Sequence, residues 1–143
     1  MSFISDTISS IRTLILNDSE IVSRLAVWNG AASVHTRLPL PEDATSPLIA
    51  VGPTMVGEND NSLNSNRLLV VSNLYCYGFN PEHIRAVEEI GYLLRDLFHR
   101  NAAFSVAGYS TIGLVAQGPS IAFSDNETTC GRLVSLSIRL LKN

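Results

Sequence analysis

The residues best suited to chemistry are three histidines, and they are widely spaced along the chain. His35, His83 and His99 are the candidates for moving a proton or binding a metal ion. A metal site needs ligands that converge, such as two histidines one helical turn apart. His83 and His99 fall on one expected helix but are separated by roughly four to five turns, so they cannot share a metal. The histidine spacing therefore predicts no metal site.

The sequence also offers little for covalent or acid–base catalysis. A nucleophilic side chain must lie beside a base that a third group orients. The chain has no Gly-x-Ser-x-Gly turn, and neither Cys76 nor Cys130 has a catalytic signature around it. Adjacent Glu88 and Glu89 point about 100° apart on a helix, so they do not face one another as an acid–base pair. We therefore expect no catalytic residue, no cofactor and no enzymatic activity.

Two polar segments are candidate binding surfaces instead. Thr54 to Asn66 and Gln117 to Gly131 are each expected to be a long, exposed loop, and long loops in compact domains are commonly functional. Carboxylate and amide oxygens can bind Ca²⁺, but the first segment lacks the ligand spacing and the distal glutamate of an EF-hand. The side chains that we assign to a candidate interface in these loops are Glu58, Asn59, Asp60, Asn61, Asp125, Asn126 and Glu127.

Four further residues complete the candidate interface: Trp28, His35, Arg37 and Arg139. Trp28 is the sole tryptophan, and it fits either the core or an interface anchor, because tryptophan is enriched at binding hot spots. His35 and Arg37 lie in a proline-punctuated stretch without periodicity. Arg139 lies on the polar face of the last expected strand.

Composition bounds the remaining possibilities. The chain has 143 residues, 45% of them hydrophobic, which suits one domain spanning 1–143 with a core that needs no disulfide. A net charge of −3 gives no basic footprint for nucleic acid. The only lysine is Lys142, so an interior Schiff-base or phosphate-loop lysine is excluded. There is no secretory signal and no apolar run of ~18 residues, which predicts a cytosol-like compartment and no membrane span.

Periodicity indicates the elements that would position these residues. A first helix has apolar residues at helical spacing, namely Ile4, Ile8, Ile11 and Ile15. Asp18 can cap a short second helix, and Asn80 and Pro81 begin a long one that reaches Arg100. The expected strands are Leu48–Val51, Arg67–Tyr77, Thr111–Ala116 and Leu133–Leu141. In the last strand, Val134, Leu136, Ile138 and Leu140 alternate with polar residues, so one face should be buried.

This order of elements predicts an α+β fold. Strands that follow one another in adjacent pairs favour a mainly antiparallel sheet, here of about four strands. The two main helices are expected to pack on one face of that sheet. No internal repeat or low-complexity tract interrupts the order.

The layout of the segments resembles a known family. The features that carry the likeness are the helix Ile4–Ile15 with its polar break, the proline-punctuated stretch Arg37–Pro47, the short apolar strand Leu48–Pro53, the strand Leu68–Tyr77, the helix Pro81–Arg100 with Leu93-Leu94-Arg-Asp-Leu97 at its core, and the amphipathic strand Leu133–Leu141. In this order the chain resembles the tail-terminator proteins of tailed bacteriophages, also called tail-completion or tail-to-head joining proteins.

The resemblance implies a small α/β protomer that assembles into a hexameric ring. The ring would cap the completed tail tube and join it to the head–tail connector or neck protein. The protein would be a virion component at the head-proximal end of the tail, present in the host cytoplasm during assembly, with no enzymatic step. No functional residue is carried over, because the family has no invariant catalytic motif.

The resemblance also motivates a hypothesis about the acidic loops. One of them would face the lumen of the ring or the tail tube. A lumen with negative walls would let DNA pass without specific binding, because contacts to phosphate need cations.

Three other functions fit the sequence. The first is a neck or minor tail protein at another position in the particle. The second is a small-molecule-binding or regulatory α+β module, which predicts a monomer or dimer with an apolar pocket. The third is an enzyme with a triad assembled from distant positions. The mass of the purified protein in solution separates a ring from the ligand-binding module, since a ring would contain about six protomers and the module one or two.

Overall fold

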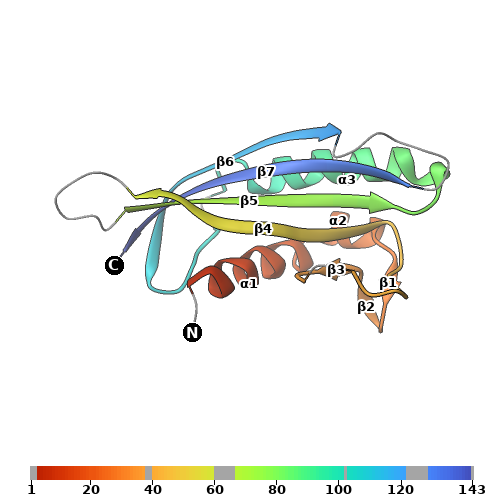
Figure 1. Cartoon of the computed structure of the whole chain (residues 1–143), viewed down its shortest axis with the longest axis horizontal. Helices are drawn as coiled ribbons and strands as arrows, with labels where there is room; N and C mark the ends of the chain where they lie inside the picture. Colours follow the sequence, from red (N-terminus) through yellow and green to blue (C-terminus); the bar gives the residue numbers. More distant parts are fainter. Residues whose placement is uncertain (1–2, 38–39, 60–66, 102, 122–128, 143) are drawn as a thin grey trace.

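The computed structural model describes residues 3–37, 40–59, 67–101, 103–121 and 129–142. In chain order the elements are α1 (Phe3–Leu16), α2 (Ser19–Arg24), β1 (Val27–Trp28), β2 (Ala31–Ala32), β3 (Val34–His35), β4 (Leu48–Asn59), β5 (Arg67–Gly78), the 3₁₀ turn η1 (Pro81–His83), α3 (Ile84–Phe98), β6 (Tyr109–Ile121) and β7 (Cys130–Lys142). A five-stranded sheet forms one layer and the helices lie behind and below it (Figure 1). The predicted α+β class is confirmed.

The sheet has the strand order β3-β4-β5-β7-β6. Its pairs β4-β5, β5-β7 and β6-β7 are antiparallel, as expected. The prediction of about four strands was one short, because β3 pairs with β4 through only two residues, Val34 and His35, and does so in parallel. A two-residue strand leaves no periodicity in the sequence to detect.

A small hairpin of β1 and β2 was also missed. Val27 pairs with Ala32 and Trp28 pairs with Ala31, which leaves Asn29 and Gly30 as the two-residue turn. Both turn residues have positive φ angles, 50° and 81°, as an Asn-Gly hairpin turn requires. The Asn-Gly dipeptide between two apolar pairs is the sequence signal that could have predicted this turn.

Helix α2 begins where the sequence placed its cap, whereas α3 begins at Ile84, three residues after the predicted start at Pro81. The backbone N–H of Ile21 donates to Asp18 Oδ1 at 3.1 Å, which caps α2. Asn80 Oδ1 accepts from the backbone N–H of Glu82 at 2.9 Å, but the turn that it caps is the 3₁₀ turn η1 that leads into α3. The helix ends at Phe98, two residues before the predicted end, and Arg100 has a left-handed φ of 57°.

The two predicted loops are shorter than expected, because strands extend into both. Strand β4 continues past Gly52 and Pro53 to Asn59, with a register shift between Val51 and Thr54 that absorbs the interruption. At the other loop, β6 continues to Ile121, with a register shift between Gln117 and Ser120. In both places the long partner strand supplies hydrogen bonds that local sequence does not reveal.

The core lies between the sheet and the helices. On β7 the predicted inward residues, Val134, Leu136, Ile138 and Leu140, are fully buried. The stripe of α3 meets them with Val87, Ile90, Leu94 and Phe98, while Ile84 at the start of the helix stays 36% exposed. Cys76 and Cys130 are buried and are not joined in a disulfide, and burial raises the pKa of the Cys76 thiol to about 12.

Close approach of α3 to the edge of the sheet depends on Gly91. A Cβ at this position would lie 2.7 Å from Pro119 Cβ of β6. One helical turn before Gly91, Glu88 accepts a 2.8 Å hydrogen bond from the guanidinium of Arg132, whose side chain is only 7% exposed. Helix α3 therefore packs closely against β6 at Gly91 and is joined to β7 by the bond between Glu88 and Arg132.

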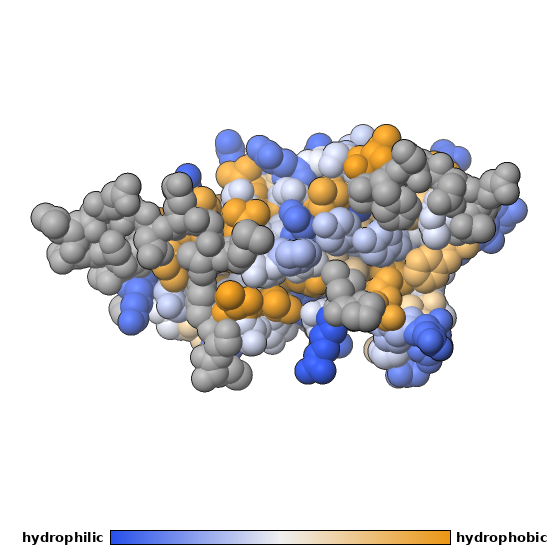
Figure 2. Space-filling model, in the orientation of Figure 1, coloured by the Kyte–Doolittle hydropathy of each residue, from blue (hydrophilic) through white to orange (hydrophobic). Residues whose placement is uncertain are grey.

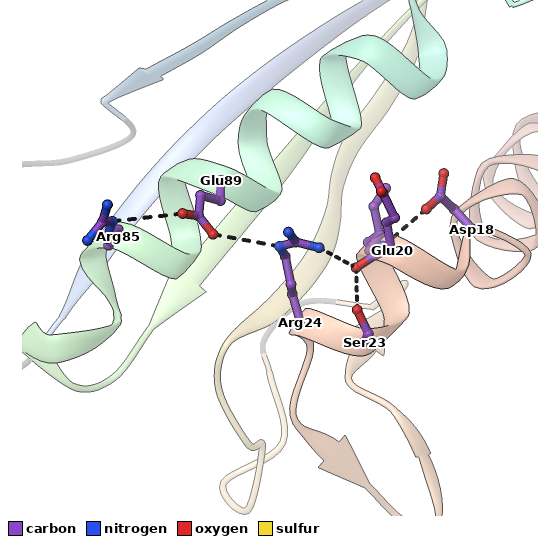
Figure 3. A network of polar contacts seen from close by, with 7 residues as sticks. Asp18, Glu20, Ser23, Arg24, Arg85 and Glu89 are labelled. Carbon is purple, nitrogen blue, oxygen red and sulfur yellow. Dashed lines mark hydrogen bonds and ion pairs between the residues drawn. The ribbon is translucent and has the colours of Figure 1, made fainter.

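A second polar network joins α2 to α3. Arg24 of α2 lies 3.6 Å from Glu89 Oε2, and Arg85 lies 3.8 Å from Glu89 Oε1 (Figure 3). Arg24 also donates to the carbonyl of Glu20, as does the hydroxyl of Ser23. The pair of Arg85 and Glu89 within α3 is thus part of a bridge between α2 and α3.

The other face of the sheet is not covered by any of the described helices. Tyr75 and Tyr77 lie on it with their rings stacked 5.6 Å apart, over a strand where Gly52 leaves room for Tyr75. Further along this face Ser135 donates to Asn73. Apolar and weakly polar residues alternate across the face, and most strongly hydrophilic side chains lie near its periphery (Figure 2). We call it the open face.

Candidate assembly surfaces

Two adjoining hollows lie between α1 and β3. The larger has a volume of about 440 Å³ and is lined by Arg12, Trp28, Val34, His35, Thr36, Arg37 and Pro41. The smaller, of about 260 Å³, shares Arg12, Thr36 and Arg37 and extends along α1 to Ser5, Ile8 and Ser9. We call them together the α1–β3 groove. The groove brings together three predicted interface residues, Trp28, His35 and Arg37.

The inner wall of the groove is built from two aromatic rings. Trp28 and His35 meet edge to face, with centroids 4.9 Å apart and planes at 63°. Trp28 is half-buried and His35 is 6% exposed, so each residue belongs partly to the core and partly to the surface. Both interpretations of Trp28, core residue and surface anchor, therefore remain compatible with its position.

His35 is held by one hydroxyl group in a defined tautomer. His35 Nε2 lies 3.0 Å from Ser33 Oγ, and that hydroxyl donates its proton to the carbonyl of Thr45 at 2.8 Å. The hydroxyl must then accept, so Nε2 carries the ring proton. Burial lowers the pKa of His35 below its ordinary 6.5, and the nearby Asp43 carboxylate only partly opposes this. The imidazole is therefore neutral at neutral pH.

The N–H groups at the groove are open to an acceptor. Trp28 Nε1 is buried and has no hydrogen-bond partner within the described part of the chain. Arg12 and Arg37 are exposed at the mouth, and neither forms an ion pair with a described residue. The groove therefore combines an apolar wall with one buried indole N–H and two exposed guanidinium groups.

Arg139 lies elsewhere, on the open face. It is exposed on β7, opposite Gly113 of β6 and Leu69 of β5. A Cβ on Gly113 would lie 3.6 Å from Arg139 Cδ, so the arginine stem lies across β6. Because β5 and β4 separate β7 from β3, Arg139 is not part of the groove.

The predicted loop residues fall mostly outside the described ranges. The backbone of Glu58 and Asn59 ends β4, paired with Leu69 and Leu68, but their side chains are not described. Asp60 and Asn61, together with Asp125, Asn126 and Glu127, lie outside the described residues altogether. These five stay predictions.

Sequence reasoning missed that the outer edge of β6 is capped. The backbone N–H of Arg100 donates to the carbonyl of Leu114 at 2.9 Å, and the N–H of Ala116 donates to His99 Nδ1 at 3.2 Å. The Arg100 N–H and the His99 ring both belong to the turn that ends α3. An edge strand normally offers unpaired backbone groups to another strand. Here the middle of that edge is already occupied, so a neighbour must bind β6 mainly through side chains.

The other candidates for chemistry have structural partners. His83 Nδ1 lies 3.3 Å from Ser46 Oγ, and His99 Nδ1 accepts from Ala116. Within the described ranges no three His, Cys, Asp or Glu residues are grouped as metal ligands would be. None of the described helices has the length and hydropathy needed to span a membrane.

Comparison with known proteins shows a likeness of fold among solved structures. No protein-family model matches the chain, and no curated protein matches it. Among solved structures, its fold is similar to that of a chain in the "Virion of native gene transfer agent (GTA) particle", with a TM-score of 0.66 and 12% sequence identity. The match covers 94% of this chain and 92% of that chain. The two chains share a fold over nearly their whole lengths.

Proposed function

We propose that this chain is a structural protein of a phage-like virion. It assembles into a ring, hexameric in our proposal, that caps the completed tail tube at its head-proximal end. The ring joins the tube to the head–tail connector or neck protein and performs no enzymatic step. DNA passes through its lumen, and the acidic Glu58–Asn61 segment faces that lumen or the tail tube.

The observation that carries this proposal is the shared fold with a chain of the gene transfer agent virion. That likeness extends over 94% of this chain and 92% of the other, so it concerns the whole subunit and not a common substructure. It agrees with the resemblance to tail-terminator proteins, which rests on separate grounds, the order of segments in the sequence.

The surfaces of the subunit support assembly into a ring. A ring of identical subunits closes through a heterologous contact, in which one patch meets a different patch. The α1–β3 groove lies at the β3 edge of the sheet, and β6 forms the opposite edge with its exposed Ile112, Val115 and Ile121. The subunit thus offers unlike surfaces on opposite sides.

The first prediction concerns the mass of the assembly. Native mass spectrometry and negative-stain imaging of the purified protein, alone and mixed with purified tail tubes, are expected to show rings of about six protomers. A species of one or two protomers under both conditions would contradict the ring and favour a ligand-binding module.

Loss of the protein from the particle distinguishes a terminator from a neck protein. A terminator stops growth of the tube, so virions made without it should have tails of irregular length and unattached heads. Tails of normal length that merely fail to join heads would instead assign the protein to the neck.

A further inference from the structure

We infer that the α1–β3 groove binds the segment 122–128 of the neighbouring copy of this chain. The inference rests on the proposed ring, and it names the two patches that meet there. It is argued from the donors of the groove, from the charge of the segment and from the order of strands in the sheet.

The groove is suited to carboxylates that lie beside an apolar side chain. Arg12 and Arg37 stand at its mouth and Trp28 Nε1 is buried in it, and among the described residues the two arginines have no ion-pair partner and the indole N–H has no acceptor. Guanidinium groups bind carboxylates with charge-assisted hydrogen bonds. Trp28 and Val34 supply an apolar wall next to these donors. The Asp43 carboxylate acts on His35, where it opposes the effect of burial on the pKa.

The segment 122–128 has the complementary composition. Its sequence, Ala-Phe-Ser-Asp-Asn-Glu-Thr, contains two carboxylates, one aromatic ring and no basic residue. The carboxylates of α3 are already in use, because Glu88, Glu89 and Asp96 each pair with an arginine of the same chain. Segment 60–66 contains a single carboxylate, Asp60. Segment 122–128 is therefore the better match to two arginines and an indole N–H.

The strand order indicates that the contact is made between copies. Segment 122–128 connects β6 to β7, whereas the groove adjoins β3. In the order β3-β4-β5-β7-β6 these are opposite edges, which at ordinary strand spacing are roughly 19 Å apart. A donor patch at one edge and an acceptor patch at the other is the arrangement that a head-to-tail contact needs.

The test uses Trp28 as the reporter, because it is the only tryptophan in the chain and lies in the groove. The full-length Asp125→Asn/Glu127→Gln protein, whose own segment is neutral, is titrated with a peptide of residues 119–129. That peptide contains no tryptophan or tyrosine, so Trp28 emission reports only on the groove. We expect a saturable change in emission, and at least ~10-fold weaker binding of the Asp125→Asn/Glu127→Gln peptide.

Matched arginine variants locate the binding site. Introducing Arg12→Gln and Arg37→Gln into the Asp125→Asn/Glu127→Gln protein should weaken its binding of the wild-type peptide by about 10-fold. Arg139→Gln removes another exposed arginine, on the open face, and should leave binding unchanged. Absence of a saturable response, equal affinity for both peptides, or equal effects of the groove and Arg139 variants would overturn the inference.

A charge swap separates this inference from the proposed ring. Arg12→Glu/Arg37→Glu is expected to dissociate the ring, and addition of Asp125→Arg/Glu127→Arg is expected to restore it. Rings that persist in the first variant would overturn the inference and leave the ring standing. A wild-type protein that binds the peptide but never forms rings would overturn the proposed function. It would leave standing the preference of the groove for the acidic segment.

Discussion

His35 lies where the core meets the α1–β3 groove, and its environment favours the neutral imidazole. The Ser33 hydroxyl fixes its tautomer, and burial depresses its pKa. In the unfolded chain the ring takes a proton near its ordinary pKa of 6.5, whereas the folded chain takes it only at lower pH. At pH values between the pKa of His35 in the folded chain and its pKa in the unfolded chain, the unfolded state binds more protons. Stability must therefore fall as the pH falls through this range.

The second prediction, at the residue scale, is therefore a pH dependence that belongs to His35. The free energy of unfolding in urea, followed by Trp28 emission, should decrease from pH 7.5 to pH 5.5 in the wild-type protein. His35→Gln should remove part of that slope, by up to about one proton, because the titrating group is gone. An identical slope in both proteins would contradict the assignment.

The third prediction compares two adjacent glutamates. Glu88 pairs with the buried Arg132, whereas Glu89 pairs with two more exposed arginines, Arg24 and Arg85. Glu88→Gln should cost about 1–2 kcal/mol of stability, because it weakens the charge-assisted bond to a buried guanidinium. Glu89→Gln should cost less than ~0.5 kcal/mol, as for a solvated pair. Chemical denaturation measures both, and equal costs would contradict the distinction.

At the scale of elements, the position of α3 is set by its contact with β6. Gly91 lets the helix backbone come close to Pro119, and Arg95 of the next turn reaches the carbonyl of Gly118 at 3.5 Å. The turn that ends the helix then bonds to the backbone of β6. Helix and edge strand therefore behave as one unit.

The fourth prediction tests that unit with a single methyl group. Gly91→Ala should destabilise the protein by about 1–2 kcal/mol, because the clash with Pro119 outweighs the gain in helix propensity. Gly113→Ala in β6 is the matched control, since its Cβ would meet Arg139 at an ordinary 3.6 Å, and it should be neutral within ~0.5 kcal/mol. Thermal unfolding of the two variants checks this, and a stabilised Gly91→Ala protein would refute it.

At the scale of the whole molecule, the sequence predicted what repeats locally. The alternation of Val134 to Leu140 in β7, the stripe of α3 and the Asp18 cap were all readable, because each signal is contained in a few turns or strand residues. The extensions of β4 and β6 could not be predicted from the sequence, since the hydrogen bonds that stabilise them come from β5 and β7.

The candidate site shows the same division. Trp28, His35 and Arg37 are near one another in sequence, and the structure does bring them together. The contribution of Arg12 depends on how α1 packs against β3, which no local pattern encodes. The cap on β6 likewise depends on where the turn after α3 lands. Surfaces of this kind follow from tertiary packing alone.

The cap on β6 bears on how many copies can join. A bare outer strand is a template on which copies can add without limit, as in amyloid. On the β6 side of the subunit, His99 and Arg100 already bond the backbone groups in the middle of that outer strand. Growth by strand addition is thereby discouraged, and association depends on side-chain fit, which can specify an angle between neighbours and hence a finite count.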